Sequence, residues 1–123
     1  MSQIFPIGGS KYGASLRAFI EAASRLHEIR KDSLRPGDWV IAKTANSVYR
    51  IRVVDPGVYE VSGGWFDKHG LSPAITRING CTWGSRTIKA DTVAACGLCI
   101  EFPKRLITSP VVAIAHIPAC QLN

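Results

Sequence analysis

The sequence predicts an α+β fold that is mainly β: an N-terminal amphipathic helix packed on a small antiparallel β-barrel or β-sandwich of six or seven strands. Three observations predict it. Apolar residues recur with helical spacing between residues 14 and 31. Beyond residue 38, short runs alternate apolar and polar residues, as half-buried strands do. Proline and glycine separate these runs, as is typical of turns.

We expect a single domain over residues 1–123, with an irregular lead-in at 1–13, the helix at 14–31 and a β-rich core at 38–118. The length of 123 residues fits the common size of one domain. A hydrophobic content of 46% with 20% charged residues is that of an ordinary globular protein and argues against intrinsic disorder. A chain of this length buries enough surface to fold without a disulfide or a metal.

The predicted helix carries one apolar stripe and one charged face. The opposite face alternates basic and acidic residues, so it is balanced in charge rather than basic. This balance favours a helix that packs across a β-core over one that binds a membrane or docks on a partner. The stripe contains Leu16, Phe19, Ile20, Ala23 and Leu26.

The clearest pair of strands, Val48–Asp55 and Val58–Ser62, flanks a turn at Asp55-Pro56-Gly57. Proline suits the second position of a type II turn, and glycine suits the third, which needs a positive φ. The alternation directs apolar side chains inward and leaves two arginines on the outer side. Glu60 is expected opposite one of these arginines, in a cross-strand ion pair. The inward residues are Tyr49, Ile51, Val53, Tyr59 and Val61.

Further strands are expected on both sides of this pair. A turn at Pro36-Gly37 leads into a strand at Trp39–Lys43. Asn79-Gly80 fits the type I′ turn of a hairpin between Ala74–Ile78 and a strand from Cys81 onward. Leu106–Ile117 is predicted as the last strand, or as a bent pair of strands broken by the proline at position 110. As a possible edge strand, it is compatible with a homodimer.

A basic, aromatic-flanked β face is the predicted binding surface. Its centre is the outer side of Val48–Asp55. Two consecutive glycines then mark a bulge or a place where another group approaches the backbone. A polar loop follows, and loops often carry functional residues. The candidate binding residues are Arg50, Arg52, Gly63, Gly64, Trp65, Lys68, His69, Arg77 and Arg86.

The charge of the chain bears on its partner. The formal net charge of +6 favours an acidic one, because charge steers association. We therefore expect a non-enzymatic binding or adaptor module that engages a protein or a polyanion through the basic face. An alternative is a small barrel that binds single-stranded nucleic acid by stacking bases on aromatic side chains. We favour the core over the surface for Trp83 and leave Trp65 open between the two.

Cysteine and histidine supply a second alternative, a zinc-stabilised domain or a cysteine/histidine-dependent enzyme. Cys96 and Cys99 have the spacing of half a zinc site. Cys81 and Cys120 each stand alone, although a zinc knuckle usually needs a second close pair. His69 is the histidine we expect on an accessible loop. Because none of these patterns is specific, we expect no catalytic residue, no metal site and no cofactor.

The expected location is the cytoplasm, without membrane contact. Residues 1–9 show no secretory signal, and the longest apolar stretch, Pro110–Cys120, is too short to span a bilayer. Reduced cysteines are the expectation in that compartment.

Overall fold

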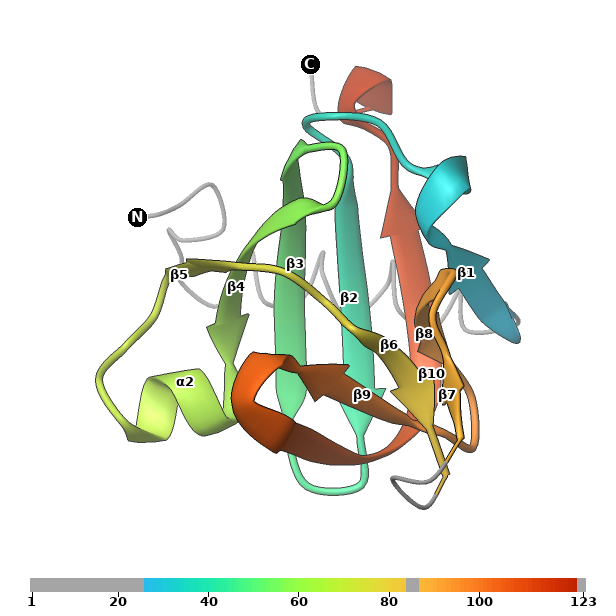
Figure 1. Ribbon diagram of the computed structural model, residues 1–123. Coiled ribbons are helices and arrows are strands. Elements are labelled where there is room, and N and C mark those ends of the chain that lie inside the picture. The colour runs from blue at the N-terminus through green and yellow to red at the C-terminus, as the bar shows by residue number, and fades with distance from the viewer. Residues whose placement is uncertain (1–25, 84–86, 122–123) are drawn as a thin grey trace.

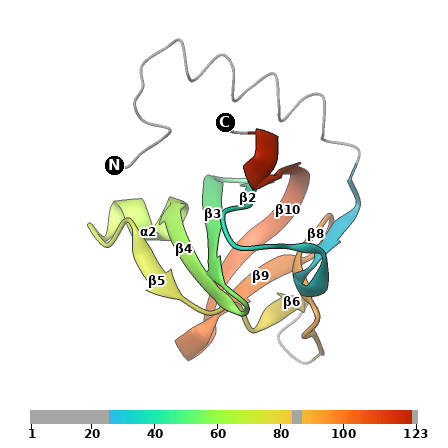
Figure 2. The ribbon, with the colours of Figure 1, turned by 90° about the horizontal axis from the view of Figure 1, so that it is seen from above.

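The structure is a computed structural model that describes residues 26–83 and 87–121. Within these residues, eight strands form one antiparallel sheet in the order β5-β4-β3-β2-β10-β9-β6-β7, and β1 pairs with β8 in a small second sheet. The large sheet is curled into a half-barrel (Figure 1), as the view from above also shows (Figure 2). The strands are β1 (Glu28–Arg30), β2 (Trp39–Thr44), β3 (Val48–Asp55), β4 (Val58–Gly63), β5 (Ala74–Thr76), β6 (Gly80–Thr82), β7 (Ile88–Lys89), β8 (Thr92–Ala95), β9 (Cys99–Phe102) and β10 (Leu106–Ile117). The helical elements are η1 (Lys31–Ser33), α2 (Gly64–Lys68), η2 (Pro103–Arg105) and η3 (Ala119–Gln121).

The predicted α+β class is wrong for the described part of the chain, which is nearly all β. It contains ten strands rather than six or seven, and none of its helices is longer than the five residues of α2. The end of the predicted helix, Glu28–Arg30, is strand β1, because pairing with Ala94 of β8 helps to bury Ile29. Tertiary pairing here overrides a helical pattern. The rest of the predicted helix, residues 14–25, lies outside the described residues.

The strands β2, β3 and β4 form an antiparallel meander that carries the candidate binding face. Strand β3 spans the predicted residues, and β4 extends one residue beyond its predicted end. The predicted turn between them needs a positive φ at its glycine, and this is confirmed, because Gly57 has a φ of 76°. All the predicted inward residues of β3 and β4 are buried. We call the opposite side of these strands, which carries Arg50 and Arg52, the outer face.

Two apolar clusters pack against the large sheet, one on each side. The main core fills the inside of the half-barrel. The second cluster lies on the outer face of β2 and β10, because Ile41 is paired with both Arg50 and Ala115. Strands β2 and β10 are therefore apolar on both sides, and this explains their long apolar runs in the sequence. The second cluster consists of Trp39, Ile41, Ala115 and Ile117.

Strand β10 corrects the expectation of a free edge at Leu106–Ile117. It pairs with β2 on one side and β9 on the other, so it is an inner strand of the sheet. It also runs unbroken through Pro110, which lies at a register shift in the pairing with β9. Such an irregularity accommodates a proline inside a sheet.

The stretch from Ala74 to Thr82 joins the two ends of the half-barrel instead of forming the predicted hairpin. Strand β5 pairs with β4, whereas β6 pairs with β9 and β7. The connecting residue Ile78 is 2% exposed and belongs to the main core. Gly80 has a φ of 145°, and a Cβ there would lie 2.4 Å from the Lys89 carbonyl oxygen. This glycine therefore permits the close approach of β7 rather than a type I′ turn.

Tyr59 gives a prediction about stability. It is 1% exposed, burial raises the pKa of its hydroxyl, and no hydrogen bond to that hydroxyl occurs within residues 26–83 and 87–121. Because a buried hydroxyl without a partner costs free energy, Tyr59→Phe should raise the free energy of unfolding by about 1 kcal/mol in urea titrations. Tyr49→Phe is the matched control and should lower it, because the Tyr49 hydroxyl accepts a hydrogen bond from the Trp65 backbone N–H at 3.1 Å. A loss of stability in Tyr59→Phe would contradict the prediction.

Candidate functional site

The Arg52 side chain forms an ion pair within the sheet. Its Nε donates to Oε1 of Glu60 at 2.9 Å, and the two residues are directly opposed on β3 and β4. The predicted cross-strand ion pair is therefore confirmed. Both side chains are partly exposed, so the pair is worth about 0.2–1 kcal/mol. Arg52 accordingly adds little uncompensated charge to the outer face.

Arg50 and Lys43 are less well neutralised. The nearest acid to Arg50 is Asp67, and the distance from Nη2 to Oδ2 is 3.8 Å, too long for a hydrogen bond. The Arg50 side chain is 31% exposed. Lys43 is exposed on the same face of β2, and no ion pair involves it within the described ranges. These two cations are therefore available to an acidic group from outside.

The double glycine lets the chain fold closely over β3. A Cβ on Gly63 would lie 2.0 Å from the Val48 carbonyl oxygen, and one on Gly64 would lie 2.2 Å from Cζ of Tyr49. Both residues also have positive φ, at 99° and 46°. The predicted close approach to this backbone is therefore present, but β3 makes it and no external group is needed to explain the glycines.

Helix α2 is positioned by aromatic packing on the sheet. Phe66 is buried and meets Phe102 and Tyr49 edge-to-face, with ring centroids 5.1 and 6.3 Å apart. The polar residues Asp67, Lys68 and His69 are thereby directed to the surface. We call Gly63, Gly64, Trp65, Asp67 and His69 the α2 corner.

Asp67 organises the α2 corner, and sequence reasoning missed it. Its Oδ1 accepts hydrogen bonds from the Gly63 backbone N–H at 2.9 Å and from the Ser72 hydroxyl at 2.5 Å. A carboxylate that reaches back to the N–H at a helix start is a known capping arrangement. The position of Asp67 shortly after the double glycine is the sequence signal that could have indicated this capping role. Lys43 was also missed, although it continues the alternation of Trp39 and Ile41 along β2.

Trp65 and His69 form a stacked pair at the surface. Trp65 is half-buried, and the two rings lie 4.2 Å apart with an interplanar angle of 23°. His69 Nδ1 lies 2.9 Å from the Trp65 carbonyl oxygen. Because a carbonyl oxygen only accepts hydrogen bonds, Nδ1 of His69 is the donor in this contact. One face of the Trp65 ring is thus already covered by the histidine.

The predicted binding residues do not all come together. Arg50 adjoins the α2 corner, whereas Arg77 reaches the Gly57 carbonyl oxygen at 3.4 Å, beside the β3–β4 turn. At roughly 3.3 Å per residue, the length of β4 places this turn about 20 Å from Gly63. Arg86 lies outside the described residues. Trp83 is 60% exposed, so the interpretation of this residue as core is wrong.

Three of the cysteines have raised thiol pKa values. Burial raises the pKa of Cys81 to about 12, and burial also raises the pKa of Cys96 and Cys99. The Cys96 thiol donates to the Leu26 carbonyl oxygen at 3.4 Å. A protonated thiol is a poor nucleophile and a poor metal ligand. Within the described ranges, no group of three or more His, Cys, Asp or Glu residues is placed to hold a metal ion.

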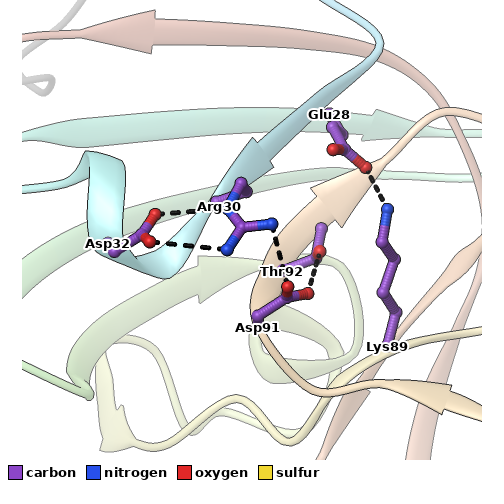
Figure 3. A network of polar contacts seen from close by, with 6 residues as sticks. All are labelled: Glu28, Arg30, Asp32, Lys89, Asp91 and Thr92. Carbon is purple, nitrogen blue, oxygen red and sulfur yellow. Dashed lines mark hydrogen bonds and ion pairs between the residues drawn. The ribbon is translucent and has the colours of Figure 1, made fainter.

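Around the small sheet, basic side chains form ion pairs with acidic ones (Figure 3). Arg30 of β1 contacts Asp32 at 3.3 Å and Asp91 at 2.9 Å, and Lys89 of β7 pairs with Glu28. These contacts connect β1 to β7 and to the turn before β8. Because Arg30 and Lys89 both have acidic partners, this region differs from the outer face around Arg50.

The described residues contain no helix long and apolar enough to cross a membrane. No protein-family model, no curated protein and no solved structure matches the chain.

Proposed function

We propose that the protein is a binding module whose outer face engages an acidic segment of a protein partner. The observation that carries the proposal is the unequal pairing of charge on β2 and β3. Arg52 is matched by Glu60 at 2.9 Å, but Arg50 has an acid only at 3.8 Å and Lys43 has no ion pair within the described residues. Complementary charge of this kind guides a partner and sets its orientation.

The aromatic groups favour a protein over single-stranded nucleic acid. Modules that bind single strands offer free aromatic faces on which bases stack. Trp65 lies in the α2 corner, where Asp67 approaches Arg50, yet His69 stacks on its ring and Phe66 meets it edge-to-face at 5.3 Å. The raised thiol pKa values of Cys81, Cys96 and Cys99 likewise favour binding over cysteine catalysis.

A charge-removal experiment tests the proposal. The probe is fluorescein-labelled poly-L-glutamate, and its affinity is measured by fluorescence anisotropy at low and at physiological salt. Removing both available cations, in Lys43→Gln/Arg50→Gln, should weaken binding about tenfold, equivalent to roughly 1.4 kcal/mol. Wild-type binding should also weaken as salt rises, because the contact is exposed and screened.

The control Arg105→Gln removes one charge from the exposed η2 turn and should leave the affinity nearly unchanged. Equal losses in the double variant and the control would overturn the proposal. Tight binding of a labelled oligothymidylate together with no binding of polyglutamate would replace it with the nucleic-acid alternative.

A further inference from the structure

Strand β5 lies at one end of the large sheet, and no other described strand pairs with its outer edge. It pairs only with β4 among the described strands, through Thr76 with Tyr59, Ile75 with Glu60, and Ala74 with Val61. No other backbone hydrogen bond involves these three β5 residues within the described ranges. An edge of this kind offers unpaired N–H and C=O groups to an added strand.

The outward side chains of this edge are apolar and basic. Ile75 is 62% exposed, more than any other large hydrophobic residue in the described ranges. Directly opposed residues of antiparallel strands share a face, so Arg52, Glu60 and Ile75 form one row across the outer face. Arg77 is exposed and lies two residues beyond Ile75, so the alternation of β5, continued past its end at Thr76, would put it on the same side.

We propose that the edge of β5 takes an extended peptide segment as an additional strand. This inference rests on the proposed function, from which it takes the acidic character of the partner. Main-chain hydrogen bonds would provide the affinity, and alternate side chains would provide the selectivity. The segment carries an apolar residue beside Ile75 and, two positions away, an acidic residue beside Arg77. The residue between them faces the inner side of the sheet with Thr76.

Charge decides against a second copy of the chain as the occupant. Each copy has a formal net charge of +6, and pairing β5 with itself would bring the Arg77 side chains of both copies to one short edge. The edge strand has only three residues, so the contact area would be small for a stable dimer. An acidic peptide would not be repelled by Arg77. A weak complex also needs only a small contact area.

The test uses the ¹⁵N-labelled full chain and two blocked peptides of identical composition. In the spaced peptide, Thr-Thr-Val-Thr-Glu-Thr-Thr, valine and glutamate share one face of a strand. In the adjacent peptide, Thr-Thr-Val-Glu-Thr-Thr-Thr, they face opposite sides. The spaced peptide should shift the backbone amide resonances of Ala74, Ile75, Thr76 and Arg77 and bind at least fivefold more tightly than the adjacent one.

Two variants test whether the peptide binds beside Ile75. Ile75→Thr should abolish the preference for the spaced peptide, whereas Ile88→Thr, at the edge strand on the other end of the sheet, should preserve it. Equal binding of both peptides, or shifts confined to Lys43 and Arg50, would overturn the inference while leaving the proposed function standing. Self-association in sedimentation velocity that Ile75→Thr removes would also overturn it, in favour of a second copy. If polyglutamate binds without depending on Lys43 and Arg50, the proposed function fails instead.

Discussion

Gly63→Ala should lower the free energy of unfolding by about 4 kcal/mol or more, enough to leave much of the protein unfolded. Gly63 has φ 99° and ψ 176°, a backbone conformation that is almost restricted to glycine and costs other residues about 1–3 kcal/mol. The added methyl would also lie 2.0 Å from the Val48 carbonyl oxygen, in backbone that cannot move without disturbing the β3–β4 pairing. Urea unfolding followed by circular dichroism measures the loss.

Gly70→Ala is the matched control for this prediction. Gly70 has a φ of 67°, but apart from Gly70 itself and its two neighbours in the chain, no described residue has an atom within 4 Å of the position that its Cβ would take. Only backbone strain remains, so the expected loss is about 1–2 kcal/mol. If the two variants lose equal stability, the close approach of β3 to Gly63 is not the reason for the double glycine.

Asp38→Ala should be the second strongly destabilising substitution, with a loss of about 3 kcal/mol. The Asp38 side chain is 7% exposed, and its carboxylate accepts hydrogen bonds from the backbone N–H groups of Arg35 and Ala119 and from Nε2 of His116. Removing it leaves three partly buried donors without a partner. Asp32→Ala, at an exposed ion pair with Arg30, should cost no more than about 1 kcal/mol and serves as the control.

The same carboxylate makes stability depend on pH. Burial raises the pKa of Asp38, but hydrogen bonds from Ala119, His116 and Arg35 outweigh it and hold the pKa below the ordinary value of 3.8. A carboxyl group whose pKa is lower in the folded state stabilises the fold above its unfolded pKa. The contribution is lost as the pH falls through the folded pKa.

The free energy of unfolding of the wild type should therefore decline more steeply below about pH 4 than that of Asp38→Asn. Urea titrations at intervals between neutral pH and pH 2 measure the difference. Parallel pH curves for the two proteins would contradict the assigned role of the carboxylate.

The alternation of apolar and polar residues correctly predicted strands that pair with their neighbour in the chain. Strands β3 and β4 are neighbours in sequence, and their alternation matched their burial from Tyr49 to Val61. The ion pair of Arg52 and Glu60 followed from the same register. Such contacts depend on a turn and a period of two, both of which a single sequence displays.

Long-range pairing decided the elements that were mispredicted. Glu28–Arg30 continues a helical stripe in sequence, but its partner β8 begins at Thr92 and cannot be read locally. Asn79-Gly80 has the composition of a hairpin turn, but β4 and β9 hold its two sides apart. At the candidate site, the arginines were visible as outward residues, whereas the role of Asp67 required knowing that the chain turns back over Tyr49.

The central place of β2 has a consequence for synthesis on the ribosome. Strand β2 needs both β3 and β10 as neighbours, yet Asp38 and His116, at the β2–β10 contact, are 78 residues apart in sequence. The meander of β2, β3 and β4 can pair as soon as it emerges, because its contacts are local. The other edge of β2 stays open until β10 has been made, and an open apolar strand is a template for pairing between nascent chains. A ribosome stalled before residue 106 would thus present Trp39–Ala42 to its neighbours on the same messenger.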